Sequence, residues 1–269
     1  MMNPEPMTWA LLLLLGTCTG VLGGIFGLGG GFLLVPMLTL LGFPVIEAAA
    51  TSLVGVFLTA FSGSLRNGWM GELNWRESAQ IALFGIPMAQ VGAWMGDRIP
   101  DAWLGLCFAL LLLSGIYLMS LRQNLSDRQQ LEEPSEEVEP PEKSVPRPWK
   151  FAQIGAIAGV MSGLFGIGGG LIIVPLHLLL IRESIQTAVV ASLGAVVPIA
   201  ASGLAQHAWN HRVLWMPGLC IGIGGMIGAQ IGTRLLPKLS PSLVNRVYRL
   251  VLFGMALYMI GQSFVKGLV

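Results

Sequence analysis

Charged residues are scarce in this chain. Of its 269 residues, 15 are Lys or Arg and 14 are Asp or Glu, so 11% are charged, whereas a soluble domain carries about 25%. Hydrophobic residues make up 54% of the chain, and the mean hydropathy is +0.73. This composition predicts an integral membrane protein. The basic residues are scattered singly, so no patch could neutralise several phosphates, and we expect no nucleic-acid partner.

Cysteine and histidine are also rare, with three of each. Cys18, Cys107 and Cys220 lie in apolar stretches, and none belongs to a CxxC or Cys/His spacing. The chain has no HExxH motif, and its glycine runs lack the Lys-Ser/Thr pair of a P-loop. We therefore expect no metal, no cofactor and no catalytic residue, which leaves an integral membrane enzyme as a disfavoured alternative.

The chain is instead rich in long apolar runs. A helix needs about 20 apolar residues to span a bilayer, and six runs approach that length. Two further pairs of runs are interrupted by glycine, and their second arms are too short for a comfortable span. The sequence predicts an all-α polytopic membrane protein with full spans near 48–65, 78–96, 102–121, 186–206, 213–233 and 246–265, and helical hairpins at 7–26 with 30–42 and 151–165 with 169–181.

The glycine breaks belong to an internal repeat. Residues 24–36 read GIFGLGGGFLLVP and residues 163–175 read GLFGIGGGLIIVP, at an offset of 139 positions. Ser52 matches Ser192 at an offset of 140, and Gly92-Ala93-x-x-Gly96 recurs later at an offset of 136. The conserved order predicts duplication of a whole unit. We expect a first membrane repeat at 1–121, a linker at 122–150 and a second membrane repeat at 151–269.

The linker differs in composition from both repeats. Residues 122–150 contain seven acids, five bases and five prolines in 29 residues. A segment with so little apolar surface cannot form a core, so the sequence predicts a disordered, solvent-exposed linker.

The distribution of Lys and Arg predicts how the repeats are inserted. If each half crosses the membrane an odd number of times, twelve basic residues fall on one side and three on the other, namely Arg98, Arg212 and Lys266. Four crossings per half give a weaker split of nine to six. The positive-inside rule then places the linker in the cytoplasm and both termini outside. An odd count also inverts the second half, as in many secondary transporters, and we expect a multi-pass protein of the plasma (inner) membrane.

Each GxGGG run could form a site for an anion. Glycine leaves backbone N–H groups accessible, successive N–H groups form a concave anion site, and a following helix adds positive charge at its N-terminus. Two such tips facing each other would hold an oxyanion without Lys or Arg. Ser52 and Ser192 are further candidate donors, although a membrane serine also bonds within its own helix. The candidate substrate-binding residues are Gly27, Gly29, Gly30, Gly31, Ser52, Gly166, Gly168, Gly169, Gly170 and Ser192.

Other residues invite simpler interpretations. Gly92 and Gly96, and likewise Gly228 and Gly232, have the small-xxx-small spacing that lets membrane helices pack closely. His177 in a hairpin arm raises the hypothesis of a proton relay. Its counterpart in the first repeat is a leucine, which argues against a symmetric role.

The paired FGxGGGxxxVP motif, Phe26 to Pro36 and Phe165 to Pro175, followed in each half by a serine-bearing helix and GAxxG, resembles the sulfite exporter TauE/SafE family of membrane transporters. The resemblance covers nearly the whole chain except the linker. It implies a secondary transporter, in particular an exporter, of a small anion such as sulfite, a sulfonate or a related organic acid. Its partners would be the lipid bilayer and a coupling ion, a proton or sodium. A passive anion channel is the main alternative.

Overall fold

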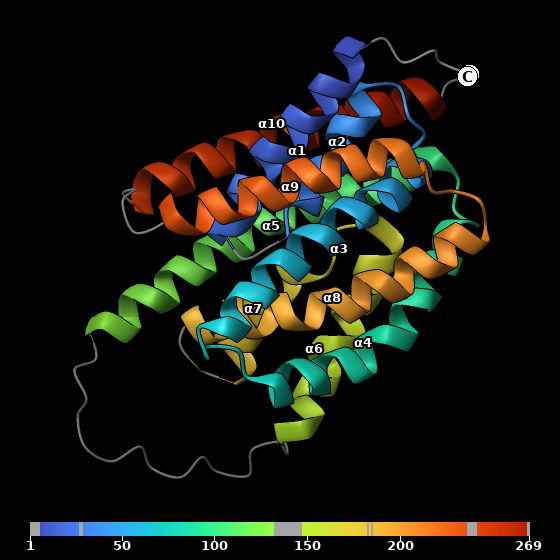
Figure 1. Ribbon diagram of the computed structural model, residues 1–269. Helices are drawn as coiled ribbons and strands as arrows, with labels where there is room; N and C mark the ends of the chain where they lie inside the picture. Colours follow the sequence, from blue (N-terminus) through green and yellow to red (C-terminus); the bar gives the residue numbers. More distant parts are fainter. Residues whose placement is uncertain are drawn as a thin grey trace.

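The computed structural model describes residues 6–26, 29–131, 147–181, 183, 185–235 and 241–267 (Figure 1). These residues form ten α-helices and no strand, so the predicted all-helical fold is confirmed. The helices are α1 (Pro6–Phe26), α2 (Gly31–Leu40), α3 (Val45–Trp69), α4 (Trp75–Gly96), α5 (Asp101–Leu131), α6 (Arg147–Phe165), α7 (Gly170–Leu180), α8 (Ile185–Trp209), α9 (Trp215–Leu235) and α10 (Pro241–Gly267).

Each predicted apolar run corresponds to one helix, with the largest difference at the linker. Helix α5 continues past residue 121 to Leu131, and α6 already begins at Arg147. Both ends of the predicted linker are therefore helical. At the first end, the last turns of α5 carry polar residues with good helix propensity. The rest of the linker, residues 132–146, lies outside the described residues, as does Gly27, and the predicted disorder stays a prediction.

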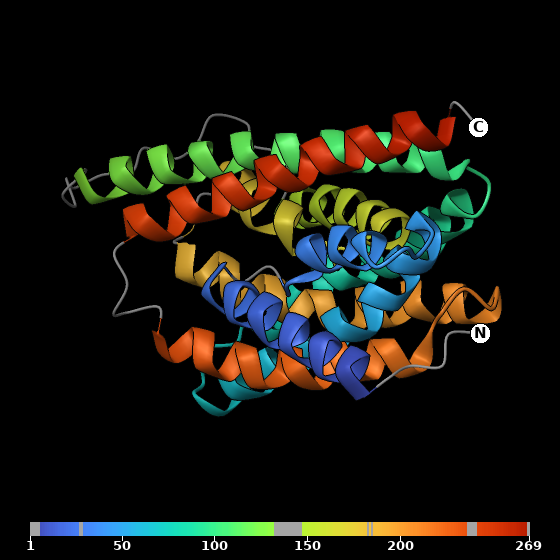
Figure 2. The same ribbon diagram turned by 90° about the horizontal axis from the view of Figure 1, so that it is seen from above.

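The helices pack in pairs that recur when the two halves are exchanged. Helix α1 packs along α9, and its counterpart α6 packs along α4. In the same way α3 contacts α9 while α8 contacts α4, and α2 contacts α10 while α7 contacts α5. Helix α3 also packs on its own counterpart α8, and α5 lies beside its counterpart α10 along one face of the molecule (Figure 2).

Small residues line the α1–α9 and α4–α6 contacts. A methyl group at Gly92 would overlap the carbonyl oxygen of Val160, and one at Gly228 would overlap that of Thr17. Such close backbone approach is how membrane helices gain packing energy where lipid supplies no hydrophobic drive. The packing interpretation of the GAxxG glycines is confirmed.

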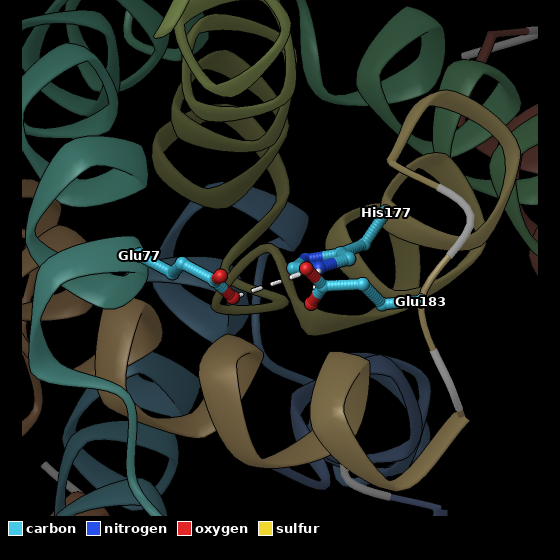
Figure 3. Close-up of side chains that lie close together, drawn as sticks. All are labelled: Glu77, His177 and Glu183. Carbon is cyan, nitrogen blue, oxygen red and sulfur yellow. Dashed lines mark hydrogen bonds and ion pairs between the residues drawn. The ribbon is translucent and has the colours of Figure 1, made fainter. Parts of the chain in front are cut away.

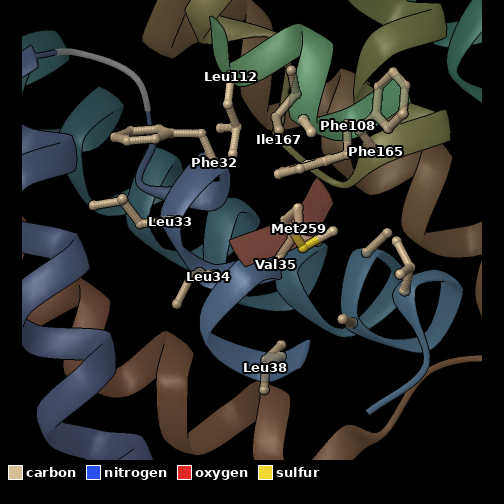
Figure 4. Packing of buried hydrophobic residues seen from close by; sticks show 14 of the residues in the cluster. Phe32, Leu33, Leu34, Val35, Leu38, Phe108, Leu112, Phe165, Ile167 and Met259 are labelled. Carbon is tan, nitrogen blue, oxygen red and sulfur yellow. The ribbon is translucent and has the colours of Figure 1, made fainter. Parts of the chain in front are cut away.

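The two short helices lie in the interior. Helix α2 has 10 residues and α7 has 11, which corresponds to about 15 Å each, half the thickness of a bilayer core. Residues 31 to 36 of α2 are all buried, in a cluster that includes Phe32, Phe108 and Phe165 (Figure 4). The rings of Phe108 and Phe165 meet edge to face with centroids 5.6 Å apart. Because Phe32 and Phe165 belong to one cluster, the first short arm and the second tip share one core.

The outer surface is apolar to a degree that is unusual in water. Leu83, Leu110 and Leu250 are each at least 66% exposed on the helix surfaces, and contiguous apolar surface of this kind marks contact with a membrane or a partner. Among the described residues, α3 and residues Thr187–Trp209 of α8 are long and apolar enough to cross a membrane. Six tryptophans are each more than half exposed and lie at or near helix ends: Trp69, Trp75, Trp103, Trp149, Trp209 and Trp215.

Candidate functional site

The two glycine tips have a backbone that other residues rarely adopt. Gly30 caps α2 with φ 77°, and Gly169 caps α7 with φ 85°. Gly29 and its counterpart Gly168 also have positive φ, at 69° and 76°. A Cβ disfavours this left-handed conformation, so glycine is required if the chain is to turn from α1 into α2, and from α6 into α7.

The tips of the two halves meet in the interior. A methyl group at Gly31 would lie 2.7 Å from the carbonyl oxygen of Gly166 and 3.0 Å from the Cα of Ile167. Gly29, Gly30 and Gly31 are buried, as are residues 166–170. The structure thus brings together glycines that lie well over 100 positions apart in the sequence.

Two matched valines separate the matched glycines. Val56 of α3 and Val196 of α8 are 140 positions apart and fully buried. A methyl group at Gly29 would lie 3.3 Å from a methyl of Val56 and 4.0 Å from one of Val196, and a methyl at Gly168 would overlap Val56. The valines therefore close the space between the tips. The sequence prediction missed them, although they share the repeat offset of Ser52 and Ser192 and could have been found by it.

Among the described residues, the second tip presents backbone N–H groups without a backbone acceptor. Among the described residues, no acceptor is found for the amides of Gly168, Gly169 and Gly170. The short helices begin at these tips, so the positive ends of two helix dipoles approach each other. The hairpin sequences 6–42 and 151–181 contain no Lys, Arg, Asp or Glu. Any charge that binds at the tips would therefore meet dipoles and no charged side chain of either hairpin.

Ser52 lies beside the second tip, and its hydroxyl already has partners. It contacts the carbonyl oxygens of Ala49 in its own helix and Gly166 at the tip of the opposite hairpin, both at 2.8 Å. It thereby holds the second tip against α3. The Ser192 hydroxyl donates to Val189 O at 2.8 Å. Gly30 and Gly169 face the first arms of their own hairpins, at Thr19 and Ala158.

Three other polar side chains within spans contact neighbouring segments of the chain. Ser202 donates to Ile86 O at 2.8 Å, Gln230 donates to the Ser62 hydroxyl at 3.0 Å, and Thr51 accepts from the Leu214 amide at 3.1 Å. Each contact satisfies a polar group that hydrocarbon would leave without a partner. These residues stabilise the fold and lie apart from the tips.

Charged residues gather at the two ends of the bundle. Asp97 accepts hydrogen bonds from Arg212, at 3.1 Å, and from Asn210. These contacts join the α4–α5 connection to the α8–α9 connection. With Trp94, Arg98 and Gln206 these residues line an open cleft of about 480 Å³.

A second cluster, Glu77 with His177 and Glu183, lies elsewhere and joins the start of α4 to the end of α7. No spacing in the sequence could reveal it, because its members come from separate segments.

Known proteins match this chain over most of its length. The family described as Sulfite exporter TauE/SafE matches residues 12–259. A probable membrane transporter protein of Xylella fastidiosa (strain Temecula1) is 31% identical, with 94% of each chain covered. One of Methanocaldococcus jannaschii is 28% identical over 93% of this chain and 94% of its own, and one of Bacillus subtilis is 24% identical over 91% and 95%. No solved structure matches. With the paired glycine tips, these matches show that the chain belongs to the sulfite exporter TauE/SafE family of membrane transporters.

Proposed function

We propose that this protein is a secondary transporter that exports a small anion, such as sulfite, a sulfonate or a related organic acid, across the plasma membrane. The observation that carries the proposal is the meeting of two glycine tips, Gly29 to Gly31 and Gly166 to Gly170, in the interior. Discontinuous helices that meet at a repeat interface are where such transporters bind their substrates.

The chemistry of the tips favours an anion of moderate affinity. Buried amides of Gly168, Gly169 and Gly170 and two helix N-termini supply positive dipoles. A lysine or arginine at mid-membrane would cost about 2.5–3.5 kcal/mol and would bind an anion tightly. Neutral donors avoid that cost, and they release the anion more readily on the far side.

Inverted halves and alternating access complete the proposal. The exchange of helix contacts between the halves supports a pseudo-two-fold relation. The α3–α4 and α8–α9 connections, which are counterparts, lie at opposite ends of the bundle in both views (Figures 1 and 2). Opposite placement of counterpart loops is expected of an inverted repeat. One half, or one hairpin, would then move against the other around the central site.

In this arrangement the valines keep the anion path closed. Val56 and Val196 are fully buried between the tips, which supports the assignment of this conformation to an occluded state. The cleft at Asp97, Arg98 and Arg212 lies at the end that the basic-residue count places outside.

Flux measured in proteoliposomes tests the proposed function. Purified protein is reconstituted and offered sulfite, sulfate, sulfonates and small carboxylates, with imposed pH or sodium gradients, beside protein-free vesicles. We expect saturable flux of one sulfur-containing anion or carboxylate that responds to one of the gradients. Flux that never saturates and ignores both gradients would establish a passive channel instead. No flux of any anion above the protein-free level would overturn the proposal.

A further inference from the structure

Three side chains with metal-binding atoms converge at one end of the second hairpin (Figure 3). Glu77 lies in the first turn of α4, His177 in the last turn of α7, and Glu183 in the α7–α8 connection. His177 is fully buried, the Glu77 side chain is 12% exposed and that of Glu183 is 24% exposed. The cluster therefore lies inside the protein while one carboxylate still faces its edge.

The distances suit coordination of one ion. The Nε2 atom of His177 lies 3.3 Å from Oε2 of Glu183 and 3.9 Å from Oε2 of Glu77, and the three ligand atoms lie within 4.8 Å of one another. Ligands about 2.1 Å from a shared tetrahedral ion are roughly 3.4 Å apart. Small shifts of the glutamate side chains would bring all three to bonding distance.

We propose that Glu77, His177 and Glu183 form a binding site for a divalent transition-metal ion such as Zn²⁺ or Mn²⁺. Imidazole nitrogen with carboxylate oxygen is a ligand set for these ions, whereas Cu⁺ favours sulfur and Mg²⁺ favours oxygen alone. A dication also balances the charge of two carboxylates that burial brings close together. Three protein ligands leave a coordination position for water, as in many zinc sites.

The site is not part of the repeated architecture. At the repeat offsets, His177 corresponds to Leu38, Glu183 to Pro44 and Glu77 to Pro217. The anion site, by contrast, is made of residues that both halves share. An unmatched cluster therefore points to a second role, separate from the symmetric centre.

A bound ion would join parts of the molecule that must move. Glu77 belongs to the first half, and His177 and Glu183 belong to the second hairpin and the connection that follows it. A metal would tie the short arm α7 to α4. This consequence rests on the proposed alternating access: the ion would hold the transporter in one state and slow its flux. Metal binding itself needs no transport and no knowledge of the anion.

The test is metal binding by the purified, full-length protein, freed of metal and prepared without a polyhistidine tag. Zn²⁺ and Mn²⁺ are titrated by calorimetry, and bound metal is measured after gel filtration. We expect about one Zn²⁺ or Mn²⁺ per chain. His177→Gln and Glu183→Gln should each weaken binding at least about tenfold. The matched control is His211→Gln, since His211 is exposed in the α8–α9 connection and should keep wild-type affinity.

Two results would overturn the site: binding of neither ion at micromolar concentrations, or equal binding by His177→Gln and the wild type. If a variant is not monodisperse, X-ray absorption of the Zn²⁺-loaded wild type decides. The site predicts one imidazole with oxygen ligands and no sulfur, and any other set contradicts it. Because these readouts are independent of flux, a failed metal site leaves the transport proposal standing, and the reverse also holds.

Discussion

At the scale of single residues, the packing at the centre of the molecule depends on glycines, which have no Cβ. Gly29 and Gly168 face the Val56–Val196 pair, and a Cβ at either position would contact those valines. The same glycines have positive φ. Two separate requirements, backbone conformation and close approach, therefore select glycine at the tips, and a suitable control can separate them.

Gly168→Ala and Gly71→Ala separate the two requirements. Both positions have nearly equal φ, 76° and 74°, but a methyl at Gly71 meets nothing within 4 Å. Both variants bear a conformational penalty of about 1–2 kcal/mol. Only Gly168→Ala adds a clash with Val56, so we expect its flux in proteoliposomes to fall at least about tenfold while Gly71→Ala stays near wild type.

Adding Val56→Ala to Gly168→Ala should restore much of the lost flux, because it removes the methyl group that clashes. Equal flux from Gly168→Ala and Gly71→Ala would show that contact between the tips and the valines does not matter for transport.

Contacts between single residues were the part of the structure that the sequence predicted least well. The glycine tips could be predicted, because a repeated run of glycine inside apolar helices is costly unless the backbone must turn or approach closely there. Ser52 lies beside the second tip, where its hydroxyl contacts Gly166 O of the other half, and its role as an anion donor stays a prediction. Glu77 and His177 are 100 positions apart, and nothing local in the sequence indicates that they meet.

At the scale of helices, apolar length and small-residue spacing determine most of the arrangement. All ten predicted helical segments are present among the described residues, because hydrocarbon forces the backbone to bond within each segment. Helix partners could not be predicted, since any small-xxx-small stripe can pack against several others. The end of α5 was placed too early because an apolar pattern stops where a helix leaves the membrane, even when the helix continues.

Gly92→Leu tests the glycine seam between α4 and α6. Its side chain would overlap Val160 O and approach the Leu164 amide, whose distance from the Cβ is already 3.0 Å. Overpacking of this kind destabilises by about 1–3 kcal/mol or more, so we expect a lower thermal unfolding midpoint in detergent. The control is Gly254→Leu in α10, where the Cβ meets nothing within 4 Å. A midpoint for Gly92→Leu equal to that of Gly254→Leu would contradict close packing at the seam.

At the scale of the whole molecule, charged contacts join loops that the basic-residue count assigns to the same side, while the sidedness itself stays a prediction. Arg98 and Arg212, two of the three basic residues predicted outside, line one cleft. Asp101, in the same group of connections, accepts from the amides of Val45 and Ile46. Glu77 and Glu183 meet near the opposite set of loops, which the basic-residue count places in the cytoplasm. Three independent contacts thus join only loops assigned to the same side.

The most direct test of the account is the side of the membrane on which two counterpart loops lie. Glu72→Cys and His211→Cys place single thiols in the exposed α3–α4 and α8–α9 connections, after Cys18, Cys107 and Cys220 are replaced. A thiol reagent that cannot cross membranes is applied to intact cells and then to permeabilised cells. Inverted halves predict labelling of His211→Cys from outside and of Glu72→Cys only after permeabilisation. Labelling of both thiols from the same side would contradict inverted halves, and with them the meeting of two opposed tips in the membrane.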